Sequence, residues 1–197
     1  MTAGRRRRVI VGITGASGSI LGIRMLERLR ELEIETHLIM SAWGARTIEH
    51  ETTWTAAEVR QLADFTHKPG DLGACVSSGS FHTDGMLVAP CSMKTLAAIA
   101  CGYTEDLVAR AADVVLKERR RLVLLAREAP LSEIHLENML KLARMGVSIV
   151  PPVPAFYNRP KTLDEVVDYI VTRALDQVGI IVDESPRWDG NMTKQRP

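Results

Sequence analysis

Residues suited to binding an anion follow several apolar segments of this 197-residue chain. They include small residues of a glycine turn, hydroxyl residues, a lysine, and an arginine followed by a glutamate. Such groups suit one phosphate on a neutral or mildly polar body, as in a flavin mononucleotide (FMN), because glycine turns and helix starts offer unpaired N–H groups. The residues are Gly15, Ala16, Ser17, Ser41, Ser92, Met93, Lys94, Thr95, Arg127 and Glu128.

The glycine turn follows the apolar run 9–13 and precedes a helical pattern. Its glycines, Gly15, Gly18 and Gly22, have the spacing G-x-x-G-x-x-x-G and not the G-x-G-x-x-G of dinucleotide sites. The next predicted strand ends at Ser41, where an NAD site would place a carboxylate. Both observations favour a mononucleotide. A turn that only packs a strand against a helix is the alternative.

A second cationic set lies further along the chain, on predicted helices. Lys117 and Arg173, with Arg110, would hold a second anion if they faced the same crevice as the first. Tyr157, on a proline-rich loop, could join them. Single cations on helices are commonly solvated, so a purely surface role stays open for each.

Few residues suit proton transfer or metal binding. Glu51 and Glu128 are the candidate proton carriers, with a capping or ion-pair role as the alternative. The five histidines show neither H-x-x-x-H nor H-E-x-x-H spacing and the three cysteines lack C-x-x-C, so we expect no metal site. The chain also lacks G-x-S-x-G, a Walker lysine and a D-D-x-x-D cluster.

Composition predicts a globular protein without a nucleic-acid or membrane partner. The formal net charge is +1, and no apolar stretch approaches the ~18 residues of a membrane span, so neither a signal peptide nor a spanning helix is expected. An odd number of cysteines, three, suits a reducing, cytoplasmic setting. We expect one domain over 1–197, with a solvated basic lead-in at 1–8 and a tail at 180–197.

Apolar strands and helices alternate along the chain, and this alternation predicts how the polar residues are positioned. It is typical of a doubly wound α/β fold, Rossmann- or flavodoxin-like, with a mostly parallel sheet covered by helices on both faces. In such a sheet the carboxyl ends of the strands meet at one edge, where α/β proteins bind ligands. A long irregular segment is expected over 67–84. The predicted strands are 9–13, 35–41, 85–90, 122–125 and 147–150.

Polar residues mark the expected helix starts. Ser17 or Ser19 is expected to cap the helix after the glycine turn. Ser132 is expected to cap a later helix, and Thr55 with Glu58 forms a capping box at another. The helix after Ser132 carries the apolar residues Ile134, Met139, Leu140 and Leu142.

Seven short motifs occur in order along nearly the whole chain. They are T-G-A-S-G at 14–18, S-S-G-S-F at 77–81, A-P-C-S-M-K-T-L at 89–96, R-A-A-D-V-V-L-K-E-R-R at 110–120, R-E-A-P at 127–130, H-L-E-N-M at 135–139 and F-Y-N-R-P at 156–160. Together they resemble the UbiX-like flavin prenyltransferases. The S-M-K-T version at 92–95 resembles the branch found as the small "B" component of phenolic-acid decarboxylase systems.

The resemblance implies a metal-independent alkyl transfer. Reduced FMN would be the acceptor, dimethylallyl phosphate the donor, and FMN prenylated at N5 and C6 the product. A UbiD-like aromatic-acid decarboxylase would receive the product. The family also implies a homo-oligomer, commonly a dodecamer.

The resemblance further implies a role for each matching residue. Glu51 and Glu128 would handle protons. Ionising an allylic phosphate also needs a π-face for the allyl cation, a role for the flavin and for Trp188. The donor phosphate would be bound by Lys117, Tyr157 and Arg173, with Lys117 also catalytic. FMN would be held by Gly15, Ala16, Ser17, Ser41, Ser92, Met93, Lys94, Thr95 and Arg127.

Two other functions stay open. A related FMN-dependent cysteine decarboxylase would share the fold and a histidine near the second helix, here His50, but would carry asparagine where Met93 and Lys94 stand. A non-catalytic flavin-binding protein is the second alternative. Cations retained at the donor site argue against it, because storage would not need them.

Overall fold

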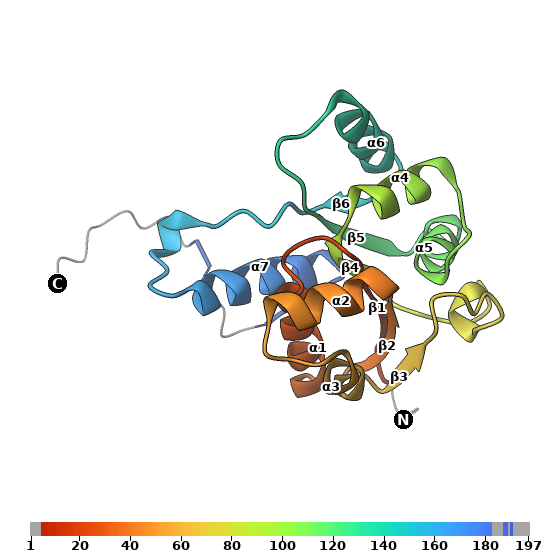
Figure 1. Cartoon of the computed structure of the whole chain (residues 1–197), viewed down its shortest axis with the longest axis horizontal. Helices are drawn as coiled ribbons and strands as arrows, with labels where there is room; N and C mark the ends of the chain where they lie inside the picture. Colours follow the sequence, from red (N-terminus) through yellow and green to blue (C-terminus); the bar gives the residue numbers. More distant parts are fainter. Residues whose placement is uncertain (1–4, 183–186, 189, 191–197) are drawn as a thin grey trace.

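Six parallel strands form one sheet in the order β3-β2-β1-β4-β5-β6 (Figure 1). The computed structural model describes residues 5–182, 187, 188 and 190. The strands are β1 Arg8–Ile13, β2 Glu35–Met40, β3 Phe65–His67, β4 Gly85–Cys91, β5 Arg121–Ala126 and β6 Ser148–Ile149. The helices are α1 Ile20–Glu31, α2 Ala42–Glu51, α3 Ala56–Leu62, α4 Met93–Cys101, α5 Leu107–Lys117, α6 Glu133–Arg144 and α7 Leu163–Gln177, with short 3₁₀ turns η1 Cys75–Ser77 and η2 Phe156–Asn158.

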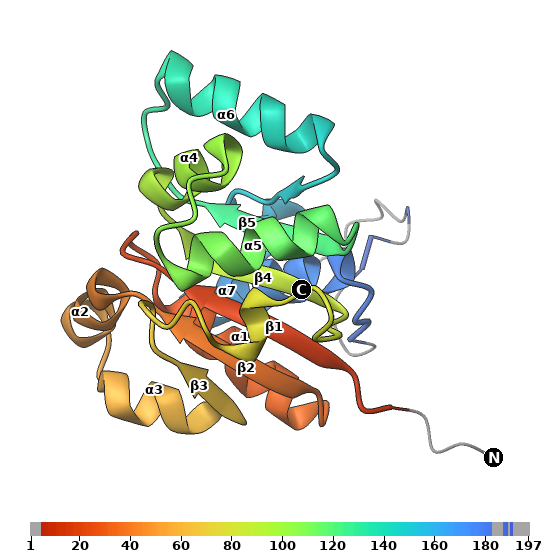
Figure 2. The same cartoon turned by 90° about the vertical axis from the view of Figure 1, so that its right-hand side faces the viewer.

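Helices cover both faces of the sheet, which confirms the predicted doubly wound fold (Figure 2). Val9 and Val11 of β1 belong to a core shared with α1, α3 and α7, whereas Ile10 points into a second core shared with α4, α5 and α6. Successive residues of a strand therefore meet different helices. This two-sided burial is why the central strands are continuous apolar runs.

The strand order reverses direction at β1, which lies between β2 and β4. The chain builds β1, β2 and β3 outward on one side and then crosses back to build β4, β5 and β6 on the other. This is the order of a Rossmann fold. It leaves a crevice at the carboxyl ends of β1 and β4, where such folds bind ligands.

Two elements differ from the sequence expectation. The edge strand β3 was not predicted, because Phe65, Thr66 and His67 show no buried apolar alternation. In α6 only Leu142 is buried, whereas Ile134 is 68% and Leu140 52% exposed. An apolar periodicity therefore predicted the helix correctly without predicting what its outer face contacts.

Ion pairs and hydrogen bonds hold the arginines at 5–8, although Arg5 and Arg6 are exposed, as a solvated lead-in predicts. Arg5 pairs with Asp84 at 3.1 Å, and Arg7 donates to the carbonyls of Val178 and Gly179 at 2.9 and 2.7 Å. Arg6 and Arg8 pair with Asp64 and Glu35. Residues 1–4 of the lead-in and 183–186, 189 and 191–197 of the predicted tail lie outside the described residues.

Within the described ranges we find no helix with both the length and the apolar character that a membrane crossing requires.

Candidate functional site

The carboxyl ends of β1, β2, β4 and β5 are joined by hydrogen bonds at one edge of the sheet. Ser41 N donates to Ile13 O at 3.0 Å, and Arg127 N donates to Cys91 O at 3.1 Å. Thr14 ties β1 to β4: its hydroxyl donates to Pro90 O at 2.7 Å and accepts from Ser92 N at 2.9 Å. The edge therefore brings together the segments at 15–17, 41, 92–95 and 127–128 that the sequence singled out. Thr14, 2% exposed, was missed as a positioning residue.

Two helices begin at this edge with serine caps. Ser41 Oγ accepts from Gly44 N at 2.9 Å at the start of α2. Ser92 Oγ accepts from Thr95 N at 3.3 Å at the start of α4 and donates to Thr95 Oγ1 at 3.1 Å. The start of α4 adjoins Arg127, an exposed residue after β5, and the start of α2 lies at the same sheet edge after β2. Helix dipoles and a guanidinium favour a bound phosphate.

The glycine turn lets α2 approach β1 closely. A Cβ atom at Gly15 would lie 2.4 Å from Trp43 Cβ, so only glycine fits there. The Trp43 side chain is 67% exposed, and the guanidinium of Arg46 lies 4.9 Å from its ring centre. Trp43 is an aromatic surface at the turn that motif spacing could not reveal.

Glu51, the last residue of α2, accepts hydrogen bonds at the N-terminus of α1. Its Oε2 accepts from Gly18 N at 2.9 Å, Ser19 N at 3.0 Å and Ser19 Oγ at 2.9 Å. Ser19 is at the cap position as expected, but its hydroxyl donates to Glu51 and makes no cap bond of its own. Desolvation, the largest effect, would raise the pKa of Glu51, but hydrogen bonds from Ser17, Ser19 and Gly18 outweigh it and lower the pKa. Glu51 is therefore an ionised base at neutral pH.

A groove of about 480 Å³ opens beside these residues. Its polar wall holds Ser17, Gly18, Arg127 and Glu128, and the Oε1 atom of Glu128 accepts from Ala129 N at 3.1 Å. The opposite wall is apolar and comes from residues 151–154 and the first turns of α7. A polar end with an apolar wall suits an amphipathic ligand. A separate cavity of about 260 Å³ adjoins Arg28, Asp168 and Tyr169.

Two of the three predicted donor residues, Tyr157 and Arg173, lie near Tyr169 of α7. Tyr157 hydrogen-bonds Tyr169 through the two hydroxyls, and its ring centre lies 5.5 Å from that of Trp188. Burial, the largest effect, raises the pKa of Tyr169, and the nearby positive charge of Arg173 partly opposes this rise. Arg173 and Arg187 both pair with Asp176, at 2.5 and 2.9 Å.

Lys117 lies elsewhere in the same chain. It ends α5, shortly before β5 begins at Arg121, which is opposite Gly85 at the start of β4. That is the amino edge of the sheet, whereas Arg127 and Glu128 lie at the carboxyl edge. Lys117 Nζ pairs with Glu118 at 2.5 Å, and Arg110, about two turns earlier in α5, pairs with Asp113 at 2.9 Å. A single chain therefore does not bring Lys117 to the predicted FMN-binding residues.

Comparisons with known proteins decide the family. A family model described as Flavoprotein matches residues 2–175. A probable UbiX-like flavin prenyltransferase from Streptomyces sp. (strain D7) is 62% identical over 184 residues, covering 93% of this chain and 92% of that protein. This chain belongs to the UbiX-like flavin prenyltransferases.

Two solved structures of such proteins share the fold. AnUbiX (PadA1), determined in complex with FMN and dimethylallyl pyrophosphate, is 55% identical with a TM-score of 0.93, covering 94% of this chain and 99% of its own. A dodecameric FMN-dependent UbiX-like decarboxylase from Escherichia coli O157:H7 is 59% identical with a TM-score of 0.91, covering 93% and 100%. Membership in the flavin prenyltransferases confirms the predicted family, fold and reaction class, and disfavours the cysteine decarboxylase and storage alternatives.

For this flavin prenyltransferase we predict that Glu51→Gln lowers the free energy of unfolding by about 1 kcal/mol at pH 7, since a charged cap of α1 is lost. Because folding lowers the pKa of Glu51, its contribution is fully present above the unfolded value of about 4.5 and is lost as the pH falls through the folded value. Thermal unfolding of both proteins from pH 7 to pH 3 measures this difference. Glu137→Gln, at an exposed position of α6, is the matched control. A pH-independent difference would contradict the assigned charge.

Proposed function

We propose that this chain joins the dimethylallyl group of dimethylallyl phosphate to N5 and C6 of reduced FMN, producing prenylated FMN. The observation that carries the proposal is the convergence of the strand ends, helix starts and Arg127 at one edge, beside a groove with an apolar wall. The complex of AnUbiX (PadA1) with FMN and dimethylallyl pyrophosphate supports both substrates.

We propose that FMN binds at the carboxyl edge. The N-termini of α2 and α4 and the Arg127 guanidinium would neutralise its phosphate, and Thr14 would keep the two strand ends in register. The close packing of Gly15 against Trp43 fixes the glycine turn beside the exposed indole of Trp43, an aromatic surface for a flat ring. The remaining proposed contacts are Ala16, Ser17, Ser41, Ser92, Met93, Lys94 and Thr95.

The transfer needs a cationic site for the leaving phosphate and a base for a proton. The carbon–oxygen bond of the donor breaks as the bond to N5 forms, and phosphate leaves with the electron pair. The Arg173 guanidinium and the hydroxyl of Tyr157 would hold the phosphate, and Trp188, whose ring lies 5.5 Å from that of Tyr157, would face the allyl group. For closure onto C6, the C=C bond of the transferred group takes up a proton at its CH carbon, its tertiary carbon bonds to C6, and C6 loses its proton. Glu51 or Glu128, as carboxylates, would accept the proton that leaves.

We propose that Lys117 completes the donor site from a neighbouring subunit of a homo-oligomer. Lys117 lies at the opposite sheet edge within one chain, and large apolar side chains are exposed near the groove: Val153 is 66%, Phe156 77% and Leu163 77% exposed. Such surfaces favour burial between subunits. The dodecameric relative from Escherichia coli O157:H7 supports a dodecamer, which light scattering would report as a mass about twelve times that of the chain.

We further propose that a UbiD-like aromatic-acid decarboxylase receives the product, as the family resemblance implies. The three cysteines are free, which suits a reducing compartment, and we propose the cytoplasm. Transfer of prenylated FMN to an apo-decarboxylase, followed by its activation, would test the partner.

The direct test is anaerobic incubation of the purified protein with reduced FMN and dimethylallyl phosphate, followed by mass and absorbance analysis of the flavin. We expect FMN carrying a dimethylallyl group, and a parallel reaction with the diphosphate compares the two donors. Arg173→Ala should lower turnover by about 10²-fold or more while leaving FMN affinity nearly intact, because it removes a cation from the leaving group only. Lys161→Ala, which removes an exposed cation just before α7, is the control. Normal FMN binding without prenylation would refute the transferase, and loss of FMN in Arg173→Ala would refute its placement.

A further inference from the structure

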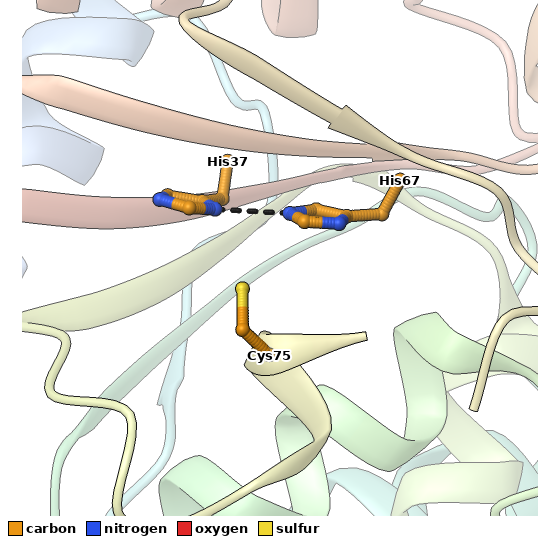
Figure 3. A group of neighbouring side chains, drawn as sticks. All are labelled: His37, His67 and Cys75. Carbon is orange, nitrogen blue, oxygen red and sulfur yellow. Dashed lines mark hydrogen bonds between the residues drawn. The ribbon is translucent and has the colours of Figure 1, made fainter. Parts of the chain in front are cut away.

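Three side chains that commonly bind metals converge away from the flavin edge. His37 from β2, His67 from β3 and Cys75 from η1 each offer a ligand atom, and these atoms all lie within 4.8 Å of one another. Figure 3 shows the two imidazoles edge to edge with the Cys75 sulfur pointing toward them. We propose that these residues bind a Zn²⁺ ion, with a water molecule as the fourth ligand.

Neighbouring strands hold the two histidines in position. In the β2–β3 register His37 is opposite Phe65 and Ile39 is opposite His67, so the two histidine side chains lie on the same face, two residues apart. Their rings are 7° from parallel, and His37 Nδ1 lies 2.9 Å from His67 Nε2. One proton joins these nitrogens, and a metal ion would replace it.

Glu35 orients His37 in the way that metal-binding histidines are oriented. His37 Nε2 donates to Glu35 Oε1 at 3.0 Å, which leaves the Nδ1 lone pair for a ligand. A carboxylate behind a histidine fixes the tautomer and raises the basicity of the ligating nitrogen. Arg8 pairs with the same carboxylate, and His37 is 3% exposed, so burial keeps its imidazole neutral.

The 3₁₀ turn that carries Cys75 is fixed to the core by its neighbour, while Cys75 itself is exposed to solvent. Its neighbour Val76 is 1% exposed and packs in the core with Ile39, which holds η1 over the sheet. Cys75 itself is exposed, giving an entry path for an ion. Tetrahedral zinc with nitrogen bonds of about 2.0–2.1 Å and a sulfur bond of about 2.3 Å needs ligand atoms about 3.3–3.6 Å apart. When the ion binds, the rings must separate slightly and the thiolate must move inward.

The types of the three ligands favour Zn²⁺ over other common metal ions. The position of His37 on β2 places the zinc site away from the proposed flavin site. Two imidazoles and one thiolate suit Zn²⁺, whereas Mg²⁺ and Ca²⁺ prefer oxygen ligands. His37 precedes the end of β2 at Met40 by three residues, about 10 Å from the carboxyl edge. The ion would fasten the edge strand β3 and the irregular segment 68–84 to the sheet. The residues lie 30 and 8 positions apart in the chain, so local spacing could not reveal the site.

Cobalt substitution tests the proposal without using the flavin reaction. The reduced, chelator-treated full-length protein is titrated with Co²⁺ and then with Zn²⁺. We expect one Co²⁺ per chain, tetrahedral visible bands, a thiolate-to-cobalt charge-transfer band in the near ultraviolet, and loss of these bands when Zn²⁺ is added. Zn²⁺ should also raise the melting temperature of the protein.

Variants decide which residues are responsible. Cys75→Ser should lose the charge-transfer band and the Zn²⁺-dependent rise in melting temperature, whereas Cys101→Ser, at another exposed cysteine, should keep both. His67→Gln, at a half-buried position, should weaken Zn²⁺ binding at least tenfold. Absence of the band in the wild type, its persistence in Cys75→Ser, or unchanged affinity in His67→Gln would each overturn the proposal.

Discussion

Gly22→Ala is expected to lower the free energy of unfolding by about 2 kcal/mol, although alanine favours a helix over glycine by about 1 kcal/mol. Gly22 lies in α1 where that helix crosses β4. An added Cβ would lie 2.3 Å from the carbonyl oxygen of Ala89 and 2.9 Å from two side-chain atoms of Ile13. Overpacking costs roughly 1–3 kcal/mol, and more where backbone must shift, so the clash outweighs the gain in helix propensity.

Thermal and denaturant unfolding at equal protein concentration would measure this loss, since assembly couples stability to concentration. Gly70→Ala is the matched control, because nothing lies within 4 Å of its added Cβ, and we expect a change within about 0.5 kcal/mol. Gly22→Ala should also weaken FMN binding, because a displaced α1 moves Gly18 and Ser19 away from Glu51. Equal stability of the two variants would show that α1 lies further from β4 than the structure places it.

The central fold could be predicted because its strands are buried on both faces. β1, β4 and β5 are apolar runs that end in turn residues, and this pattern has few alternatives. The edge strand β3 has one exposed phenylalanine and two polar residues, so only its pairing with β2 defines it. The outer face of α6 shows a further limit: periodicity detects an apolar stripe but not whether its own chain or another covers it.

Some residues of the candidate site could be predicted from the sequence, whereas their contacts with distant elements could not. Gly15, Ser41, Ser92 and Arg127 were predictable together because parallel strands carry their ends to one edge. Glu51 was predicted as a proton carrier, but its bonds to Gly18 and Ser19 cross 33 and 32 residues and no motif contains them. Contacts between distant elements, such as those of Thr14 and of the histidine pair, become visible only in the folded chain.

Subunit complementation should restore activity that two single variants each lose. Lys117→Ala and Arg127→Ala are each expected to lower turnover by about 10²-fold or more, since each removes a charge that we propose binds a phosphate. If one chain supplies Arg127 and its neighbour supplies Lys117, a randomly mixed oligomer with equal amounts of both variants contains sites in which both residues are intact. About a quarter of the sites should be intact, because each of two chains must be the suitable one.

Co-expression with two different tags, purification through both, and the prenylation assay would measure this recovery. The matched control mixes Arg127→Ala with Glu51→Gln. Both residues lie at the carboxyl edge of one chain, where Glu51 binds Gly18 and Gly18 lines the groove with Arg127. Every site in that mixture lacks one of them, so no recovery is expected. Recovery in the control, or none with Lys117→Ala, would show that the residues are not divided between chains in this way. Recovery confined to the Lys117→Ala mixture follows from the topology, because α5 ends at the amino edge and β5 ends at the carboxyl edge.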